Sequence, residues 1–171
     1  MCNSDIGSIV YYPDPVLRAR ARDVTDVASE EVHDVIRRLT QTMAEFDHCV
    51  GLAANQIGSD LNIFVADASK NTRVSSEYGF VVVINPLIVE HSNPIKQREG
   101  CMSVPDLTGN VTRAQHVIVA GIDPEGKSLE LVAHDFEARV FQHEIDHVIG
   151  KVFLDRVTTA RDVFTRRTYR S

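Results

Sequence analysis

Apolar residues recur along the chain at helical spacing in two places. From Ser29 to Asp47 they recur every third or fourth position, which is the spacing of one face of an α-helix. Ser29 stands before two glutamates and is suited to cap this helix, because its hydroxyl can accept a hydrogen bond from the first turn. A second helix is predicted from Glu137 to Ile149. It is closed by Gly150, since glycine readily adopts the left-handed conformation that follows a helix.

Between the helices, apolar and β-branched runs predict strands. These runs are Leu61–Ala66, Phe80–Val89, Val117–Ala120 and Leu129–Val132. Asn85-Pro86 interrupts the second run, and the polar stretch 67–79 predicts a loop before it. The turn residues of 123–126 fit a hairpin connection between the last two runs. Because the strands cluster rather than alternate with helices, the order predicts an α+β fold and not a doubly wound sheet.

The composition predicts one globular domain over residues 1–171. Of these residues 43% are hydrophobic, which is enough for a core, and the formal net charge is −6. An acidic chain argues against DNA or RNA as the main partner, because phosphate binding needs a basic face. No apolar run approaches the roughly 18–20 residues of a membrane span, and the first residues lack the basic and apolar regions of a secretory signal. We therefore expect no membrane association.

The cysteines also indicate a compartment. Cys2, Cys49 and Cys101 are odd in number and irregular in spacing, which is not the pattern of a disulfide framework. A reducing cytoplasm is the simplest location. A cysteine there is catalytic, bound to a metal or merely buried.

His143, Glu144 and His147 form the most informative pattern in the chain. Residues four positions apart share a helix face, so both imidazoles can reach one metal ion. Glu144 lies about 100° further round the helix, so it would flank such a metal without readily binding it. That place suits a general base acting on water. Because so short a pattern also occurs by chance in ordinary helices, a metal site needs further ligands.

A catalytic site of the zinc type takes three protein ligands and leaves one position open. Downstream, the carboxylates on offer are those of Asp155 and Asp162. Upstream, Cys101 follows Gly100, where a backbone can approach a ligand closely, and thiolates bind zinc or iron strongly. An intracellular cysteine is most often a small buried side chain. We favour Cys101 as the third ligand because the histidine pair lacks one.

A third segment, 49–58, is rich in small residues and contains Gln56, whose amide is a hydrogen-bond donor. By itself it is most simply a turn after the first helix. Taken together, the three segments resemble the three ordered motifs of the peptide deformylase family. The segments are Cys49-Val50-Gly51-Leu52-Ala53-Ala54-Asn55-Gln56, Glu99-Gly100-Cys101-Met102-Ser103 and Gln142-His143-Glu144-Ile145-Asp146-His147. The resemblance extends to Pro13–Arg18 and Phe153–Arg156 and so covers most of the chain.

The resemblance implies a fold of antiparallel sheets around a central metal-binding helix. It implies that Cys101, His143 and His147 bind one divalent metal, with a water or hydroxide in the fourth position. The metal would be Fe2+ in the cell, with Zn2+, Ni2+ or Co2+ able to substitute. Glu144 would take the proton of the water and deliver it to the departing amine. Gln56 and the backbone N–H of Met102 would donate hydrogen bonds to the formyl oxygen.

The resemblance also implies the substrate, the N-formyl-methionyl end of a nascent polypeptide, and the products, formate and a free amino terminus. Substrate-binding positions would be Val50, Gly51, Gly100 and Val140. The backbone at Val50 and Gly100 would pair with the extended peptide, and Val50, Met102 and Val140 would border the methionine pocket.

One position departs from the family pattern: Cys49 stands where the family has glycine. If the position requires a positive φ, cysteine is strained there. If it is extended, Cys49 lies just outside the substrate groove, and a second thiol near the metal is the remaining alternative. A basic tail offers a contact with ribosomal RNA or is simply a solvated terminus. Its members are Arg161, Arg166, Arg167 and Arg170.

Two other functions compete with this interpretation. The first is a zinc endopeptidase of the His-Glu-x-x-His type, which generally takes its third ligand downstream of the helix. The second is a non-catalytic binding protein with a structural metal, which closes all four positions with protein groups. The upstream position of Cys101 counts against the first, and the lack of an obvious fourth ligand counts against the second.

Overall fold

The computed structural model describes residues 8–71 and 76–166. Helix α1 spans Glu30–Glu45 and helix α2 spans Asp135–Val148. The strands are β1 (Gly51–Ala53), β2 (Ile63–Asp67), β3 (Phe80–Cys101), β4 (Val104–Ile122), β5 (Ser128–His134) and β6 (Val163–Thr165). Short 3-10 helices cover Pro15–Arg18, Ala54–Ile57, Ala68–Lys70, Phe153–Arg156 and Ala160–Asp162.

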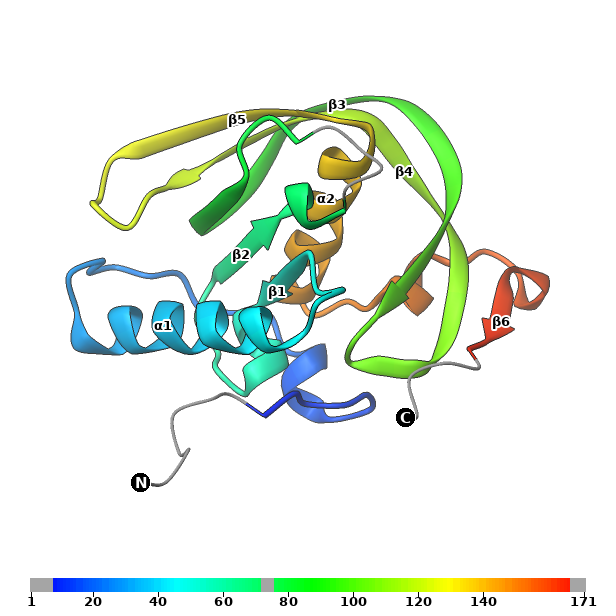
Figure 1. Ribbon diagram of the computed structural model, residues 1–171, viewed down its shortest axis with the longest axis horizontal. Coiled ribbons are helices and arrows are strands. Elements are labelled where there is room, and N and C mark those ends of the chain that lie inside the picture. Colours follow the sequence, from blue (N-terminus) through cyan, green and yellow to red (C-terminus); the bar gives the residue numbers. More distant parts are fainter. Residues whose placement is uncertain (1–7, 72–75, 167–171) are drawn as a thin grey trace.

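The strands form one antiparallel sheet in the order β1-β2-β3-β4-β5, and β6 pairs with β4. The long hairpin of β3 and β4 curves around α2, while α1 lies on the other side, by β1 and β2 (Figure 1). The predicted α+β class is therefore confirmed, with α2 in the central place that the resemblance implies.

Alternate residues of β2 belong to two different cores, because successive side chains of a strand point to opposite faces. Phe64 packs against Phe141 of α2, with ring centroids 5.8 Å apart. Ile63 and Val65 belong instead to the cluster that contains Leu39 of α1. The sheet thus separates the two helices, and α2 is enclosed by apolar packing.

The predicted helix ends agree closely with the structure. The Ser29 hydroxyl accepts a hydrogen bond from the N–H of Val32 at 3.4 Å, as expected of an N-cap. Gly150 follows α2 with a φ of 81°, and a Cβ there would lie 2.7 Å from the carbonyl oxygen of Arg18. Only glycine fits this combination of backbone conformation and close contact.

The strand prediction is wrong in extent. The strand predicted to end at Val89 continues to Cys101, so the polar stretch before Cys101 is part of β3. A register shift between Ile84 and Leu87 accommodates Asn85-Pro86 as a bulge, and the Asn85 side chain pairs with the backbone of Val24. The predicted hairpin is correct: β4 and β5 pair up to Ile122 and Ser128. Of the predicted 67–79 loop, residues 72–75 lie outside the described residues.

Replacing Phe141 with alanine tests the packing that holds α2 in the sheet. Phe141 is 1% exposed, so we expect Phe141→Ala to lower the free energy of unfolding by about 3–5 kcal/mol. Leu87→Ala is the matched control, because Leu87 is 62% exposed and its change should stay within about 0.5 kcal/mol. Urea denaturation measures both. Equal losses for the two variants would contradict this description of the core.

Candidate metal centre and active site

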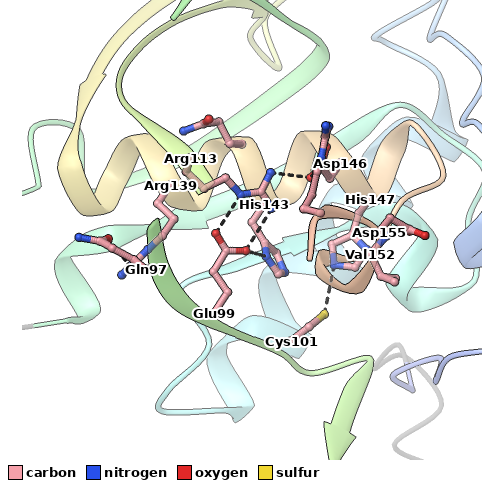
Figure 2. A network of polar contacts seen from close by, with 12 residues as sticks. Gln97, Glu99, Cys101, Arg113, Arg139, His143, Asp146, His147, Val152 and Asp155 are labelled. Atoms are coloured by element: carbon pink, nitrogen blue, oxygen red, sulfur yellow. Dashed lines mark hydrogen bonds and ion pairs between the residues drawn. The ribbon is translucent and has the colours of Figure 1, made fainter. Parts of the chain in front are cut away.

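Cys101 at the end of β3 meets His143 and His147 of α2. One potential ligand atom from each of the three residues lies within 4.8 Å of the others. Cys101 Sγ is 3.2 Å from His147 Nε2, and Figure 2 shows both histidines projecting from α2 toward this strand. The structure therefore brings together the residues that the sequence suggested as ligands, although they are 42 positions apart at their nearest.

The hydrogen bonds of the two histidines differ. His143 Nδ1 donates to Glu99 Oε2 at 3.1 Å, so Nε2 is the nitrogen that would bind a metal after giving up its proton. Burial alone lowers the pKa of His143, but hydrogen bonds to Cys101 and Glu99 outweigh it and raise the pKa well above its usual range. The site thus favours positive charge. Burial and the neighbouring His143 lower the pKa of His147 well below its usual range, so its imidazole is neutral. One sulfur and two imidazoles suit zinc, iron, nickel or cobalt.

A buried ionic network stands behind the histidines (Figure 2). Arg113 of β4 donates to Glu99 Oε1 at 2.8 Å and to Asp146 Oδ2 of α2 at 2.5 Å. Arg156 donates to the same Asp146 carboxylate. We call Glu99, Arg113, Asp146 and Arg156 the ionic network. It connects β3, β4 and α2 and ends on the ring of His143.

The network sets the charge of Glu99. Burial alone raises the pKa of this carboxyl, but hydrogen bonds from His143 and Arg113 outweigh it and lower the pKa to about 2. Glu99 is therefore ionised at neutral pH. An ionised carboxylate on His143 Nδ1 fixes the tautomer and the orientation of the ring.

Glu144 lies in a contrasting environment. It is 4% exposed, and its Oε2 has no hydrogen-bond partner among the described residues. Burial raises its pKa to about 7, against the opposing effect of His143. A Cβ on Gly51 would lie 2.5 Å from Glu144 Oε1, so any other residue at this position would displace the carboxylate. Gly51 thus makes room for Glu144, a role that the sequence did not indicate.

Gln56 points its amide at the same place. Its Oε1 accepts from the N–H of Ala53 at 2.9 Å, which fixes the orientation of the amide. Its Nε2 lies 3.1 Å from Ser103 Oγ and 3.5 Å from Cys101 Sγ. Met102 lies in the turn between β3 and β4, directly after Cys101. Both residues border the space in front of the potential ligands.

That space is a cavity of about 260 Å³. All of the predicted substrate-binding residues line it, and so do two of the three potential metal ligands, Cys101 and His143. The lining residues already named are Cys49, Val50, Gly51, Gln56, Glu99, Gly100, Cys101, Met102, Val140, His143 and Glu144. Its apolar side chains and its few convergent polar groups are typical of a small-molecule or peptide-end site.

The alternative ligands have other partners. Asp155 accepts from Arg18, and Asp162 accepts from Lys96 at 2.6 Å. Cys49 lines the cavity rather than lying just outside it, and it is not among the residues with a positive φ. Burial and the neighbouring Glu144 raise the pKa of its thiol to about 12. The group of potential ligand atoms found in the described residues contains Cys101 and not Cys49.

Sequence reasoning missed Arg113, Arg156 and Asn55. The Asn55 amide donates to the carbonyl oxygen of His147 at 2.5 Å and so ties the first motif to the last. Asn55 and Asp146 lie inside the motifs, where their polar character could have indicated such contacts. Nothing in the residues around Arg113 marks it, because its partners lie 14 and 33 positions away.

Comparisons with known proteins agree with the site. Residues 6–162 match the family model described as "Polypeptide deformylase". A peptide deformylase of Syntrophobacter fumaroxidans is 41% identical over 160 residues, 93% of this chain and 91% of that protein. Peptide deformylase 2 of Vibrio cholerae is 44% identical over 147 residues, 86% of this chain and 83% of that protein.

Solved structures agree as well. The crystal structure of a Legionella pneumophila peptide deformylase has a TM-score of 0.81 at 36% identity, covering 90% of this chain and 86% of that one. A Synechococcus elongatus peptide deformylase in complex with actinonin has a TM-score of 0.81 at 33% identity, covering 94% and 83%. In the described part of the chain, no helix has both the length and the apolar character to cross a membrane.

The ionic network predicts unequal effects for its two arginines. Arg113 is 5% exposed and bridges two buried carboxylates, so Arg113→Met should lower the free energy of unfolding by about 3–5 kcal/mol. Arg156 is 39% exposed and leaves Asp146 with its other partner, so the control Arg156→Met should cost much less. Urea denaturation checks the order. A smaller loss for Arg113→Met than for Arg156→Met would contradict it.

The lowered pKa of Glu99 predicts that the free energy of unfolding decreases at acid pH. Its folded pKa of about 2 lies below the usual 4.5, so its contribution is complete above pH 4.5 and is lost as the pH falls toward 2. The loss should be on the order of 3 kcal/mol. Urea denaturation of chelator-treated protein at several pH values measures it without a contribution from metal release. Glu99→Gln should reduce this pH dependence. If the pH dependence is unchanged in that variant, another group is responsible for it.

Proposed function

The chain belongs to the polypeptide deformylase family, and from this premise we propose how its own residues remove the formyl group of an N-terminal formyl-methionine and release formate. The observation that carries the proposal is the position of Glu144. It lies in the cavity wall beside the potential metal ligands, with its carboxylate in the room left by Gly51. A structural metal site does not require a buried carboxylate whose Oε2 has no hydrogen-bond partner in the described part of the chain.

In this proposal Cys101, His143 and His147 hold one divalent metal, Fe2+ in the cell, with Zn2+, Ni2+ or Co2+ able to substitute. The mixed sulfur and nitrogen ligands accept any of these ions, so supply decides which is bound. When bound, the ion acts as a Lewis acid that lowers the pKa of a water and polarises the formyl carbonyl.

Glu144 moves the proton. Its buried carboxylate lies in the cavity wall beside the potential ligands, where it can accept a proton from the attacking water and return it. The oxygen of that water bonds to the formyl carbon, the bond from carbon to nitrogen breaks, and Glu144 delivers the proton to the leaving nitrogen. The products are formate and a free amino terminus.

Gln56 and the N–H of Met102 donate to the formyl oxygen as negative charge develops on it. The bond from Ala53 to Gln56 Oε1 supports this role, because it holds the amide with Nε2 toward the cavity. In other hydrolases such a donor is worth about 2.7–4 kcal/mol.

The substrate lies in the same cavity. We propose that the backbone of Val50 and of Gly100 pairs with the extended peptide, and that Val50, Met102 and Val140 border the methionine side chain. Gly51 contributes through the space it leaves for Glu144. A cavity of about 260 Å³ suits the end of a peptide better than an internal segment.

The two competing functions fit less well. Downstream carboxylates, which an endopeptidase of this type would need, already pair with Arg18 and Lys96. A structural metal needs a fourth protein ligand, and the group found in the described part of the chain has three members.

We propose that residues 1–171 act as a single catalytic domain in the cytoplasm, on nascent chains and without DNA or membrane partners. The acidic net charge of −6 supports this. The basic tail is proposed to contact the ribosome transiently. Its members Arg167 and Arg170 lie outside the described residues, so this contact has only sequence support.

The reaction predicts strong selectivity for formyl over acetyl. A formyl-Met-Ala-Ser peptide should release formate, whereas the acetyl peptide should be cleaved poorly, because its methyl group must occupy space shaped for a hydrogen. Measuring the free amine from both peptides with nickel-loaded protein checks this. Equal rates would contradict the proposal, and cleavage confined to internal bonds would favour the endopeptidase.

Glu144→Gln separates the base from the ligands. The amide keeps the shape of the side chain but cannot accept the proton, so we expect turnover to fall by about 10²–10⁴-fold. Metal content should remain near one ion per chain, as measured by elemental analysis. Near-normal turnover would assign the base to another group, and loss of the metal would show that Glu144 is a ligand.

A further inference from the structure

Three arginines reach the cavity from separate parts of the fold. They are Arg98 of β3, Arg139 of α2 and Arg166, which follows β6. We call these residues the arginine rim. The mechanism proposed above uses none of them, and the family motifs in this sequence do not include them.

Arg139 projects from the metal-binding helix one turn before His143 (Figure 2). Its guanidinium donates to Gln97 Oε1 at 2.5 Å and lies 5.0 Å from the centre of the Phe136 ring. Both partners are neutral. The side chain is half-buried, so its charge reaches the cavity with little screening by water.

Arg98 is held in a similar way on β3. Its guanidinium donates to Asn110 Oδ1 at 2.9 Å and to Thr108 Oγ1 at 3.1 Å, and it stacks 3.4 Å over the Phe164 ring. These partners are neutral too. They orient the guanidinium. Asp162, an acidic residue, already accepts hydrogen bonds from Lys96 and Asn110, which lower its pKa, and Arg98 helps to lower it.

Arg166 lies over the strand beside Cys101. Its Nη1 is 2.6 Å from the place where a Cβ on Gly100 would stand, so only glycine lets the guanidinium approach the strand so closely. Gly100 is also the residue proposed to pair with the substrate backbone. The charge of Arg166 is therefore next to the expected path of the peptide.

Two acidic side chains also line the cavity. They are Glu99 and Glu144. Among the described residues, Glu99 accepts hydrogen bonds from Arg113 and His143, and neither glutamate hydrogen-bonds to Arg98 or Arg139. The cavity wall therefore combines three guanidinium groups with two carboxylates, neither of which is paired with Arg98 or Arg139.

We propose that the arginine rim binds a substrate carboxylate downstream of the formyl-methionine, so that the chain prefers nascent peptides with an acidic residue at the second or third position. This rests on the proposed function. Two guanidinium groups held by neutral partners are preorganised for a carboxylate, which accepts charge-assisted hydrogen bonds. A free C-terminal carboxylate of a short peptide has the same chemistry and is distinguished by the test.

The test compares matched peptides on nickel-loaded protein. Formyl-Met-Glu-Ala-amide and formyl-Met-Ala-Glu-amide are each measured against their glutamine counterparts, and formyl-Met-Ala-Ala is measured as free acid and as amide. At low salt, kcat/KM should be about 3–10-fold higher for the glutamate peptide than for its glutamine counterpart in at least one pair, mainly because KM is lower. The ratio should fall toward one as salt is added. The ratio of kcat/KM for the free acid to that for the amide shows how far a C-terminal carboxylate can serve as the ligand.

Variants locate the effect. Arg98→Gln and Arg139→Gln should bring the glutamate-to-glutamine ratio toward one, while Arg98→Lys and Arg139→Lys should keep it above one because the charge remains. Arg161→Gln is the matched control, since Arg161 is exposed and does not line the cavity, and its ratio should equal that of the wild type.

The outcomes are separable. A glutamate-to-glutamine ratio of one or below in both pairs, measured with the wild type at low salt, would overturn the proposed role of the arginine rim, whether or not the variants fold. An unchanged ratio in both glutamine variants would overturn it as well. In either case, formate from the neutral peptides leaves the proposed function standing, whereas no formate from any peptide would contradict the proposed function itself.

Discussion

The buried guanidinium of Arg113 is the interaction on which the site depends. It is 5% exposed and stands between the carboxylates of Glu99 and Asp146, which belong to β3 and α2. Two carboxylates in a protein interior repel each other and lose their hydration, so neither is tolerated without a cation. Arg113 and Arg156 together balance their charge. The strand that carries Cys101 is thereby held in a fixed position relative to the helix that carries the histidines.

Two glutamates of this cavity show how position determines chemistry. Glu99 receives hydrogen bonds from His143 and Arg113 and has a pKa of about 2, so it is a permanent anion that orients a ring. Glu144 is buried without such donors and has a pKa of about 7, so it can exchange a proton. The same side-chain type thus serves as an anchor in one place and as a base in the other. Gly51 makes the second environment possible by leaving space for the carboxylate.

Short sequence patterns predicted the structural features that are determined by interactions between neighbouring residues. Helix caps at Ser29 and Gly150, the hairpin before β5 and the shared face of His143 and His147 all follow from a few neighbouring residues. The full lengths of β3 and β4 do not follow from neighbouring residues. Their exposed, polar residues carry no apolar alternation, and their pairing arises from contacts with a distant strand.

The same limit applies to the site. Its motif residues are recognisable because they recur in a family, but Arg113 and the arginine rim lie outside the motifs. Arg113 has meaning only beside Glu99 and Asp146, and Arg98 only beside the ring of Phe164. Cys49 could not be interpreted from sequence either, because the state of its thiol depends on burial and on the nearby Glu144.

X-ray absorption at the metal edge tests the central claim most directly, since it counts the atoms bound to the ion in solution. The arrangement of Cys101, His143 and His147 predicts one sulfur and two imidazole nitrogens, with a light atom from solvent completing the set. Cys101→Ser should remove the sulfur signal, and Cys49→Gly should leave it unchanged. Two sulfur atoms in the wild type, or a sulfur signal that persists without Cys101, would contradict the account.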